Sequence, residues 1–151
     1  MNVKLLNSSD SIDEMEYNAA YGALTCHTNQ HKDFTPSDVL KRIIKAGHES
    51  VLEHITLTFE VNDLSRACLQ ELARHRHTSL SVESTRHTLK KNMKYGDIVL
   101  TVNVREMRHI LKQRISPDAL KEFQVLAHKL FDAVPNDYTY LLEDCLYKED
   151  N

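Results

Sequence analysis

The sequence is poor in the residues that form phosphate-binding loops, since its 151 residues include only three glycines and three prolines. It has neither the glycine-rich dinucleotide fingerprint nor a Walker loop, which argues against a Rossmann fold. No stretch approaches about 18 uncharged apolar residues, and the N-terminal Met1-Asn2-Val3-Lys4 lacks the apolar run of a signal peptide. We therefore expect a cytoplasmic protein that makes no contact with a membrane.

Cysteine is also scarce. The three cysteines, Cys26, Cys68 and Cys145, are an odd number in no close pairing, which is typical of reduced thiols. Several histidines lie between residues 75 and 87, but no cysteine or carboxylate set accompanies them at the spacing of metal ligands. The sequence thus predicts neither a disulfide framework nor a metal site.

The net charge of -3 hides two basic segments. Residues 74–91 carry five Lys and Arg against one acid, and residues 103–115 carry four against one. Basic segments within an acidic chain indicate a focused anion site more than a nucleic-acid surface, which usually raises the charge of the whole domain. A phosphorylated small molecule is the expected ligand.

The length favours a single domain over residues 1–151. A chain of this size buries roughly 68–70% of its unfolded surface, which leaves little wall for a large cofactor pocket. If the ligand is large, we expect neighbouring subunits to help enclose it.

Apolar periodicity places elements along the first half of the chain. Residues 9–24 have apolar side chains at helical spacing and predict a helix. The order of Thr35-Pro36-Ser37-Asp38 is typical of an N-cap, a first-turn proline and a first-turn acid, and the helix it opens should end near Gly47. Residues 54–61 alternate apolar and polar side chains, which predicts a half-buried strand.

A third helix, capped by Asn62-Asp63, is expected to run through Leu72 and to deliver the first basic segment. Residues 77–91 are expected to form loop and extended chain. The pattern then predicts a strand over residues 97–102 and a helix over residues 104–114.

Ser116-Pro117-Asp118 is expected to cap a long amphipathic helix that breaks at Pro135, and a last helix is expected over residues 136–147. The whole pattern predicts an α+β fold, predominantly helical, with a small and mostly antiparallel sheet.

The segment from Arg74 to His87 concentrates guanidinium, imidazole and hydroxyl groups with almost no opposing acid. Arginine offers a planar fork of donors that matches phosphate, and serine and threonine hydroxyls complete an oxyanion cradle. A basic helix end followed by a polar loop is also typical of an ordinary solvated surface. Composition alone leaves both interpretations open.

The order of these residues is more specific. Arg74-His75-Arg76, then Ser84 and Arg86, resembles the signature of the flavin-dependent thymidylate synthases, the ThyX family. The segment from Gly47 to His54 looks like the family's upstream element. Asn103-Val104-Arg105, followed by His109 and Arg114, looks like its downstream element. The resemblance extends from about residue 20 to the C-terminus.

The resemblance implies a ThyX-like fold assembled as a homotetramer, with active sites shared between subunits. It implies an FAD site lined by Ser50, Arg74, His75, Arg76, Asn103, Arg105 and His109. It implies that dUMP is held by Glu71, Arg74, Glu83, Ser84, Thr85, Arg86 and Arg114. The implied reaction is methylene transfer from methylenetetrahydrofolate to dUMP, with NADPH as the reductant of FAD and dTMP as the product.

The residue types suit that chemistry. Carbon 5 of uracil is a poor nucleophile, and no cysteine lies in the proposed site segments to activate it by addition at carbon 6. Arg114, expected against the uracil ring as the catalytic group, would instead stabilise the ionised ring electrostatically. Ser84 is expected to position the nucleotide and not to act as a nucleophile, because no general base is evident beside it.

Two departures from the family pattern bear on substrate and activity. The family commonly has Asn-Glu where this chain has Ser81-Val82, and Glu83 is the nearest substitute for the missing glutamate. Only residues 92–102 separate Lys91 from Asn103, where family members usually carry a long helical insertion with another nucleotide-binding arginine. Lysines 90, 91 and 94 could replace that arginine by charge alone.

Three alternatives therefore stay open. One is an enzyme of the same scaffold that acts on another pyrimidine nucleotide or adds another one-carbon group. A second is a catalytically degenerate flavin- or nucleotide-binding protein. Nucleic-acid binding through the basic segments is the third, and its affinity would fall steeply with salt.

Overall fold

A computed structural model describes residues 1–27, 33–84, 95–114 and 120–146. The elements follow in the order β1 (Asn2–Leu5), α1 (Ser9–His27), α2 (Pro36–Ala46), η1 (Glu49–His54), β2 (Thr56–Ser65), α3 (Arg66–Leu72), β3 (Thr78–Val82), β4 (Tyr95–Asn103), α4 (Val104–Arg114), α5 (Lys121–Asp132), η2 (Asn136–Leu141) and η3 (Glu143–Cys145), where η marks a short 3₁₀ helix. The predicted α+β fold, mostly helical with a small sheet, is confirmed.

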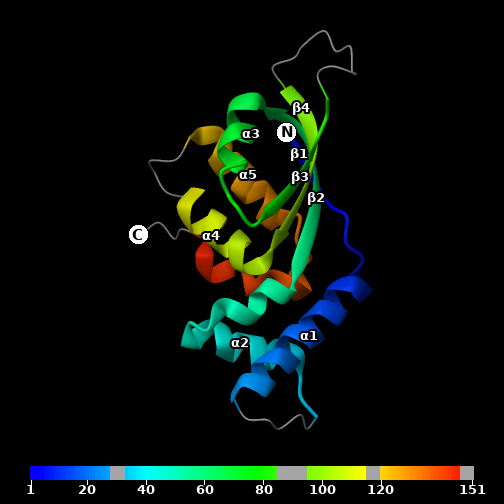
Figure 1. Ribbon diagram of the computed structural model, residues 1–151, viewed down its shortest axis with the longest axis vertical. Coiled ribbons are helices and arrows are strands. Elements are labelled where there is room, and N and C mark those ends of the chain that lie inside the picture. Colours follow the sequence, from blue (N-terminus) through cyan, green and yellow to red (C-terminus); the bar gives the residue numbers. More distant parts are fainter. Residues whose placement is uncertain (28–32, 85–94, 115–119, 147–151) are drawn as a thin grey trace.

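The four strands form one sheet in the order β1-β2-β4-β3, and each neighbouring pair is antiparallel. Figure 1 shows α3, α4 and α5 on one side of this sheet, with α1 and α2 beyond its lower end. Strand β1 was not expected, because four residues are too few to show a reliable period of two.

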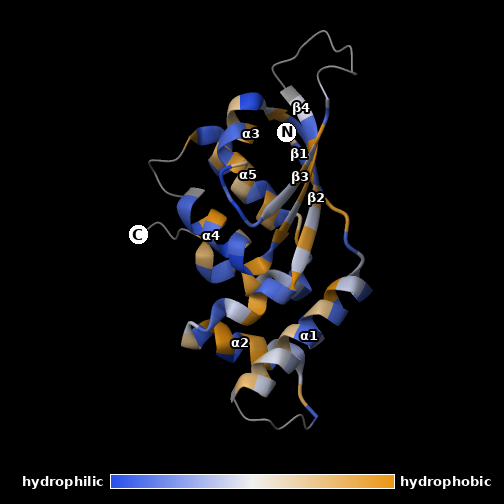
Figure 2. Ribbon diagram, in the orientation of Figure 1, coloured by the Kyte–Doolittle hydropathy of each residue, from blue (hydrophilic) through white to orange (hydrophobic). Residues whose placement is uncertain are grey.

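The core lies between the sheet and the helices. Leu57, Phe59 and Val61 alternate along β2 and are all buried, as the sequence predicted. Helix α5 buries Phe123 and Leu126 at the expected helical spacing. Figure 2 shows hydrophobic residues recurring along the strands and on the helices beside them.

The two N-terminal helices agree with the sequence. Helix α1 begins at Ser9 as expected and continues three residues beyond Leu24. Helix α2 begins at Pro36 and ends before Gly47, whose φ of 77° is left-handed and whose N–H bonds to carbonyls of the last turn. A residue without a Cβ adopts that conformation without strain, which explains the glycine.

The expected start of the central strand was wrong. Residues 49–54 form the 3₁₀ helix η1, and β2 begins at Thr56 instead of His54. The Ile55 N–H donates to the Leu52 carbonyl at 3.2 Å, so His54 belongs to the 3₁₀ turn and the strand begins after it. Helix η1 later forms one wall of the candidate site.

The expected cap of the third helix was also wrong. Strand β2 continues past Asp63, which takes a φ of 57° and donates its N–H to Asp97 Oδ1 at 3.1 Å. The pairing with β4 shifts register between Val61 and Leu64, as in a β-bulge. The cap is Ser65, whose Oγ accepts the Cys68 N–H at 3.1 Å.

The loop expected over residues 77–91 contains strand β3, and residues 85–91 lie outside the described residues. The same is true of the expected cap at Ser116-Pro117-Asp118, so α5 is described from Lys121, and it ends at Asp132 rather than at Pro135.

The expected last helix was wrong. The segment forms η2 and η3, and the Cys145 N–H donates to the Leu142 carbonyl at 2.9 Å. In an α-helix the same N–H would donate to the Leu141 carbonyl, and here that oxygen accepts a hydrogen bond from Arg108 at 2.6 Å. The segment packs on α1, where the Tyr138 hydroxyl donates to Asp13 Oδ1 at 2.6 Å.

Candidate functional site

A polar cavity of about 440 Å³ lies where α4 meets η1 and the turn after α3. It is lined by Glu49, Glu53, His77, Asn103, Arg105, Glu106 and His109. Its volume falls in the range of ~300–1,000 Å³ that is typical of small-molecule sites. Asn103, Arg105 and His109 belong to the FAD site that the resemblance implies, so the fold brings these three together.

The start of α4 organises this cavity. Asn103 ends β4, and its Oδ1 accepts the Glu106 N–H at 2.8 Å, which caps the helix. The first helical N–H donates to the Ile55 carbonyl at 2.8 Å and joins α4 to the segment after η1. Arg105 and His109 are four residues apart, so both lie on the exposed side of the helix.

His75 connects the first basic segment to α4. Its Nδ1 lies 3.0 Å from Glu106 Oε1, and only 9% of the His75 side chain and 13% of the Glu106 side chain are exposed. The His75 ring meets the His109 ring edge-on, with 6.4 Å between the centroids. Two of the expected FAD residues are therefore in ring contact, and a carboxylate holds one of them.

Arg105 forms an ion pair across the cavity mouth. Its Nη1 lies 2.9 Å from Glu53 Oε1, and the two side chains are 49% and 51% exposed. Ion pairs this exposed contribute only about 0.2–1 kcal/mol. The guanidinium can therefore exchange the carboxylate for an anionic ligand at little energetic cost.

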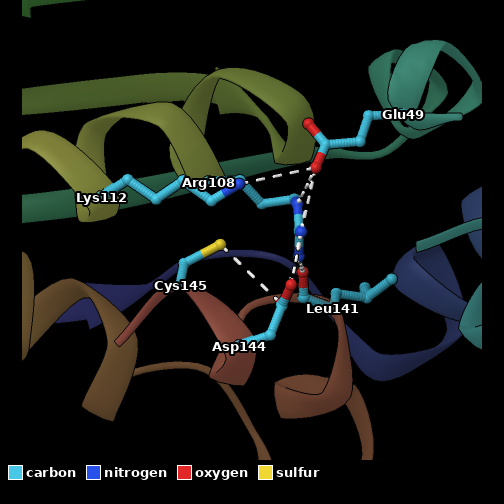
Figure 3. A network of polar contacts seen from close by, with 6 residues as sticks. All are labelled: Glu49, Arg108, Lys112, Leu141, Asp144 and Cys145. Carbon is cyan, nitrogen blue, oxygen red and sulfur yellow. Dashed lines mark hydrogen bonds and ion pairs between the residues drawn. The ribbon is translucent and has the colours of Figure 1, made fainter. Parts of the chain in front are cut away.

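Behind the cavity, Arg108 is almost completely buried, with 2% of its side chain exposed. Figure 3 shows its guanidinium between Glu49 and the C-terminal residues Leu141 and Asp144. Nε and Nη2 donate to Glu49 Oε1 at 3.1 and 3.0 Å, and Nη1 and Nη2 donate to the two Asp144 oxygens at 2.6 and 2.7 Å. The protein thus occupies all three nitrogens, and Arg108 fixes the wall of the cavity.

This cluster shifts several pKa values. Burial lowers the pKa of Arg108, but the hydrogen bond to Asp144 and nearby negative charges outweigh it, so the pKa of Arg108 lies above its usual range. The hydrogen bonds from Arg108 lower the pKa of Asp144. Burial raises the pKa of the Cys145 thiol to about 11. Cys145 is therefore protonated at neutral pH and is a poor nucleophile.

Other residues expected at the site lie outside the cavity of their own chain. Arg74 is exposed and pairs with Glu71, with 3.2 Å between Nη1 and Oε1. Arg76 and Ser50 are also exposed, and neither they nor Arg74 line the cavity. The structure therefore gathers only part of the expected FAD set in one pocket of one chain.

Glu83 extends the pairing of β3 with β4. Its N–H donates to the Asp97 carbonyl at 3.0 Å, and its Oε2 accepts the Asp97 N–H at 3.2 Å. The nearest substitute for the family glutamate at Val82 is thus bonded to a strand backbone. Ser84, which follows, is exposed.

Thr85, Arg86 and lysines 90, 91 and 94 lie outside the described residues. Arg114 is the last residue of α4, and its side chain is likewise outside them.

Sequence reasoning missed four of the seven lining residues, namely Glu49, Glu53, His77 and Glu106. The two η1 glutamates stand in the segment that resembles the family's upstream element, so their place in that motif was the available signal. Glu106 had no comparable signal, because only the fold brings it to His75.

Within the described ranges, no group of three or more His, Cys, Asp or Glu side chains is arranged to hold a metal ion. In the same part of the chain, every helix is too short or too polar to cross a bilayer.

Known proteins share both sequence and fold with this chain. The family model for thymidylate synthase complementing protein matches residues 4–96. The chain is 32% identical to the flavin-dependent thymidylate synthase of Campylobacter jejuni over 161 aligned residues, covering 70% of this chain and 78% of that protein. It is 33% identical to the Helicobacter pylori enzyme over 159 residues, covering 66% and 76%.

Each alignment has more positions than this chain contributes residues to it, so the alignment contains gaps in this chain. Both relatives therefore carry residues with no counterpart here. The fold also matches a crystal structure of thymidylate synthase X from Helicobacter pylori with FAD and dUMP. That match has a TM-score of 0.82 and 27% identity, and it covers 98% of this chain and 100% of the other.

Fold and cavity together define a small α+β protein whose antiparallel sheet leads into a polar, ligand-sized pocket at the start of one helix. The matches in sequence and structure make the class more specific. The chain belongs to the family of flavin-dependent thymidylate synthases, whose named members are enzymes. The family expected from the motifs is confirmed.

Proposed function

We propose that this protein catalyses the FAD-dependent methylation of dUMP to dTMP in the cytoplasm, as a single catalytic domain over residues 1–151. Methylenetetrahydrofolate is the one-carbon donor and NADPH the reductant. The observation that carries the proposal is the meeting of Asn103, Arg105 and His109 in one cavity. A matching structure of a family member holds both FAD and dUMP.

The cavity suits a flavin nucleotide chemically. Asn103, Arg105 and His109 offer amide, guanidinium and imidazole donors to phosphate or to an electron-rich ring. His75 lies beside these donors, in edge contact with His109, and Ser50, Arg74 and Arg76 complete the flavin set in the proposal. Bound FAD supplies the hydride chemistry, while the protein binds it and stabilises negative charge on it.

The nucleotide set in the proposal is Glu71, Arg74, Glu83, Ser84, Thr85, Arg86 and Arg114. Among the residues that the structure describes, no cysteine lines the cavity, so covalent activation of uracil by a thiolate has no support there. Arg114 is assigned to the uracil ring, where a permanent positive charge favours the ionised pyrimidine.

The arrangement of β3 supports an active site shared between subunits of a homotetramer. His77 lines the cavity at the start of β3, whereas Ser84 follows its far end. An extended chain rises about 3.3 Å per residue, so these positions are roughly 20 Å apart. Ser84, which the proposal assigns to the nucleotide, therefore lies far along its own strand from the flavin cavity, and in the proposal a neighbouring chain brings its nucleotide residues to that cavity.

Absorption spectroscopy of the gently purified protein tests the proposal, with the released chromophore identified. We expect bound FAD whose anaerobic reduction by NADPH is faster when dUMP is present. We also expect tritium release from carbon 5 of dUMP when methylenetetrahydrofolate is added. Release from UMP or dCMP instead would identify another pyrimidine nucleotide as the substrate. A colourless protein that cannot be reconstituted with FAD would contradict the proposal and favour a degenerate binding protein.

Subunit sharing has its own test. Arg105→Ala removes a proposed flavin residue, and Arg86→Ala removes a proposed nucleotide residue. At limiting FAD each variant alone should have strongly reduced activity, but co-refolded mixtures should regain activity through sites that contain both intact sets. Mixtures that stay inactive while forming tetramers would argue against sharing.

Arg114→Ala tests the assignment of the catalytic group. Removing a group that stabilises transition-state charge lowers turnover by about 10²–10³-fold. We expect that loss in methyl transfer with FAD retention nearly unchanged. Equal loss of both would make Arg114 a structural residue.

A further inference from the structure

Glu106 lies at the junction of the cavity and the first basic segment, yet the resemblance assigns it no role. It is in the first turn of α4, and Asn103 Oδ1 accepts its N–H at 2.8 Å. Its carboxylate lines the cavity and meets His75 Nδ1 at 3.0 Å. Glu106 therefore contacts two residues of the expected FAD set, one through its backbone and one through its side chain.

The backbone of His75 is already fixed by its neighbours. Its N–H donates to the Leu72 carbonyl at 3.1 Å, and its carbonyl accepts the Thr78 hydroxyl at 2.7 Å. These bonds leave the two side-chain torsions of His75 to be set. The contact with the Glu106 carboxylate restrains both, because a short hydrogen bond at Nδ1 favours one direction and one plane of the ring.

The same contact determines where the proton lies. A carboxylate can only accept, so the Nδ1 of His75 carries the hydrogen and the neutral ring is the Nδ1–H tautomer. Both side chains are nearly buried, which strengthens the bond relative to one in water. The fixed ring then packs edge-on against His109, which lines the cavity.

We propose that Glu106 is a positioning residue that acts through His75. Its carboxylate holds the imidazole in the orientation and tautomer with which the protein binds flavin. This inference rests on the proposed function, because FAD is the ligand concerned. Partners that orient a metal-ligating histidine typically contribute about 10–100-fold to metal affinity, and we expect the lower end of that range for Glu106.

The first experiment is a titration of FAD-free protein with FAD, followed by flavin fluorescence. Glu106→Ala should weaken binding about tenfold. Glu106→Gln should retain most of the affinity, because the amide oxygen can still accept from Nδ1–H. Glu122→Ala is the matched control, since Glu122 occupies the first turn of α5 and accepts the Ser65 N–H at 2.9 Å, away from the cavity. It should lower the melting temperature without changing FAD affinity.

A double-mutant cycle separates positioning from a direct contact. If Glu106 acts through His75, Glu106→Ala should weaken FAD binding no further in a His75→Ala background. Nitrogen NMR of FAD-free protein gives a second readout, because wild-type and Glu106→Gln should show the His75 Nδ1–H tautomer and Glu106→Ala should show a mixture.

The outcomes distinguish this inference from the proposed function. Wild-type protein with no affinity for FAD would overturn both. Wild-type protein that binds FAD, with a Glu106→Ala variant that binds equally well, would overturn the inference alone. Additive losses in the cycle would do so too, because they would make Glu106 a direct contact independent of His75.

Discussion

Two arginines of α4, three residues apart, have opposite environments and different roles. Arg105 is 49% exposed at the mouth of the cavity and makes one ion pair with a half-exposed carboxylate. Arg108 is 2% exposed, and its three nitrogens donate to two carboxylates and a backbone carbonyl. The Arg105 guanidinium is available to a ligand, whereas the Arg108 guanidinium is fully hydrogen-bonded within the protein.

The difference comes from the direction in which the helix points each side chain. Arg108 shares the inward side of α4 with Met107 and Leu111, so its charge is tolerated only with partners on every side. Arg105 faces outward beside His109 and needs no such set. The contrast shows that two basic residues in the same charged segment can contribute to different free energies. Arg108 contributes to the free energy of unfolding, and Arg105 contributes to that of ligand binding.

Arg108→Met should have the largest effect. The change leaves Glu49 and Asp144 without their buried partner and frees the Leu141 carbonyl. Breaking a buried ion pair by removing one member costs about 3–5 kcal/mol. We expect the free energy of unfolding to fall by about 3 kcal/mol, since both carboxylates keep some contact with water, as measured by urea denaturation. Arg105→Met is the matched control, and a loss under about 1 kcal/mol for Arg108→Met would remove the contrast.

Arg105→Met should show the reverse pattern. Its exposed ion pair contributes at most about 1 kcal/mol to stability. A charge-assisted hydrogen bond to an anionic ligand is worth about 1.5–3 kcal/mol, so FAD affinity should fall at least about tenfold. Titration with FAD and a melting curve on the same preparation measure both quantities. Unchanged affinity would show that Arg105 does not hold the cofactor.

Strong acid should weaken the buried cluster around Arg108. The pKa of Asp144 is lowered in the folded protein by hydrogen bonds from Arg108. Its contribution is therefore complete above the unfolded pKa near 4 and is lost as the pH falls through the lower folded value. Asp144 is half exposed, so the contribution should be about 1 kcal/mol or less.

The measurement is the free energy of unfolding between pH 7 and pH 3 for wild-type and Asp144→Asn. The variant should be less stable at pH 7 and should lose less stability on acidification. An equal acid slope in Asp144→Asn would show that other carboxylates carry the effect, and Asp132→Asn, a change at an exposed helix end, should leave the slope unchanged.

Much of the fold could be predicted from periodicity alone. Helix α4 has the predicted bounds, and the buried side of β2 is the predicted one, because both patterns are sustained over several residues. The errors fall where long-range contacts override local signals. Asn62-Asp63 looks like a helix cap but forms a bulge held by Asp97, and Arg108 takes the carbonyl that a last α-helix would need.

The site was predictable only as a set of motif positions. The resemblance named Asn103, Arg105 and His109, and the fold brings these three into one cavity. It assigned no role to Glu53, although this residue lies in the upstream element, and it did not name Glu106, which only the fold brings to His75 across 31 positions of sequence. Counting charges along the sequence also could not show that Arg108 is buried and paired with Glu49 and Asp144.

Glu53→Gln should have the smallest effect, and it tests the contrast between Arg105 and Arg108 by changing the partner of Arg105 instead of the arginine itself. The substitution removes the exposed partner of Arg105 and one negative charge from the cavity, so the guanidinium meets an anionic ligand without first leaving a carboxylate. An exposed pair of about 0.2–1 kcal/mol converts to a gain in FAD affinity of about 1.4-fold to fivefold, with stability changed by less than about 0.5 kcal/mol. Glu143→Gln makes the same charge change on η3 and should leave FAD binding unaltered. A tenfold loss of affinity in Glu53→Gln would instead mean that Glu53 contacts the cofactor, and Arg105 would then belong, like Arg108, to a structural pair.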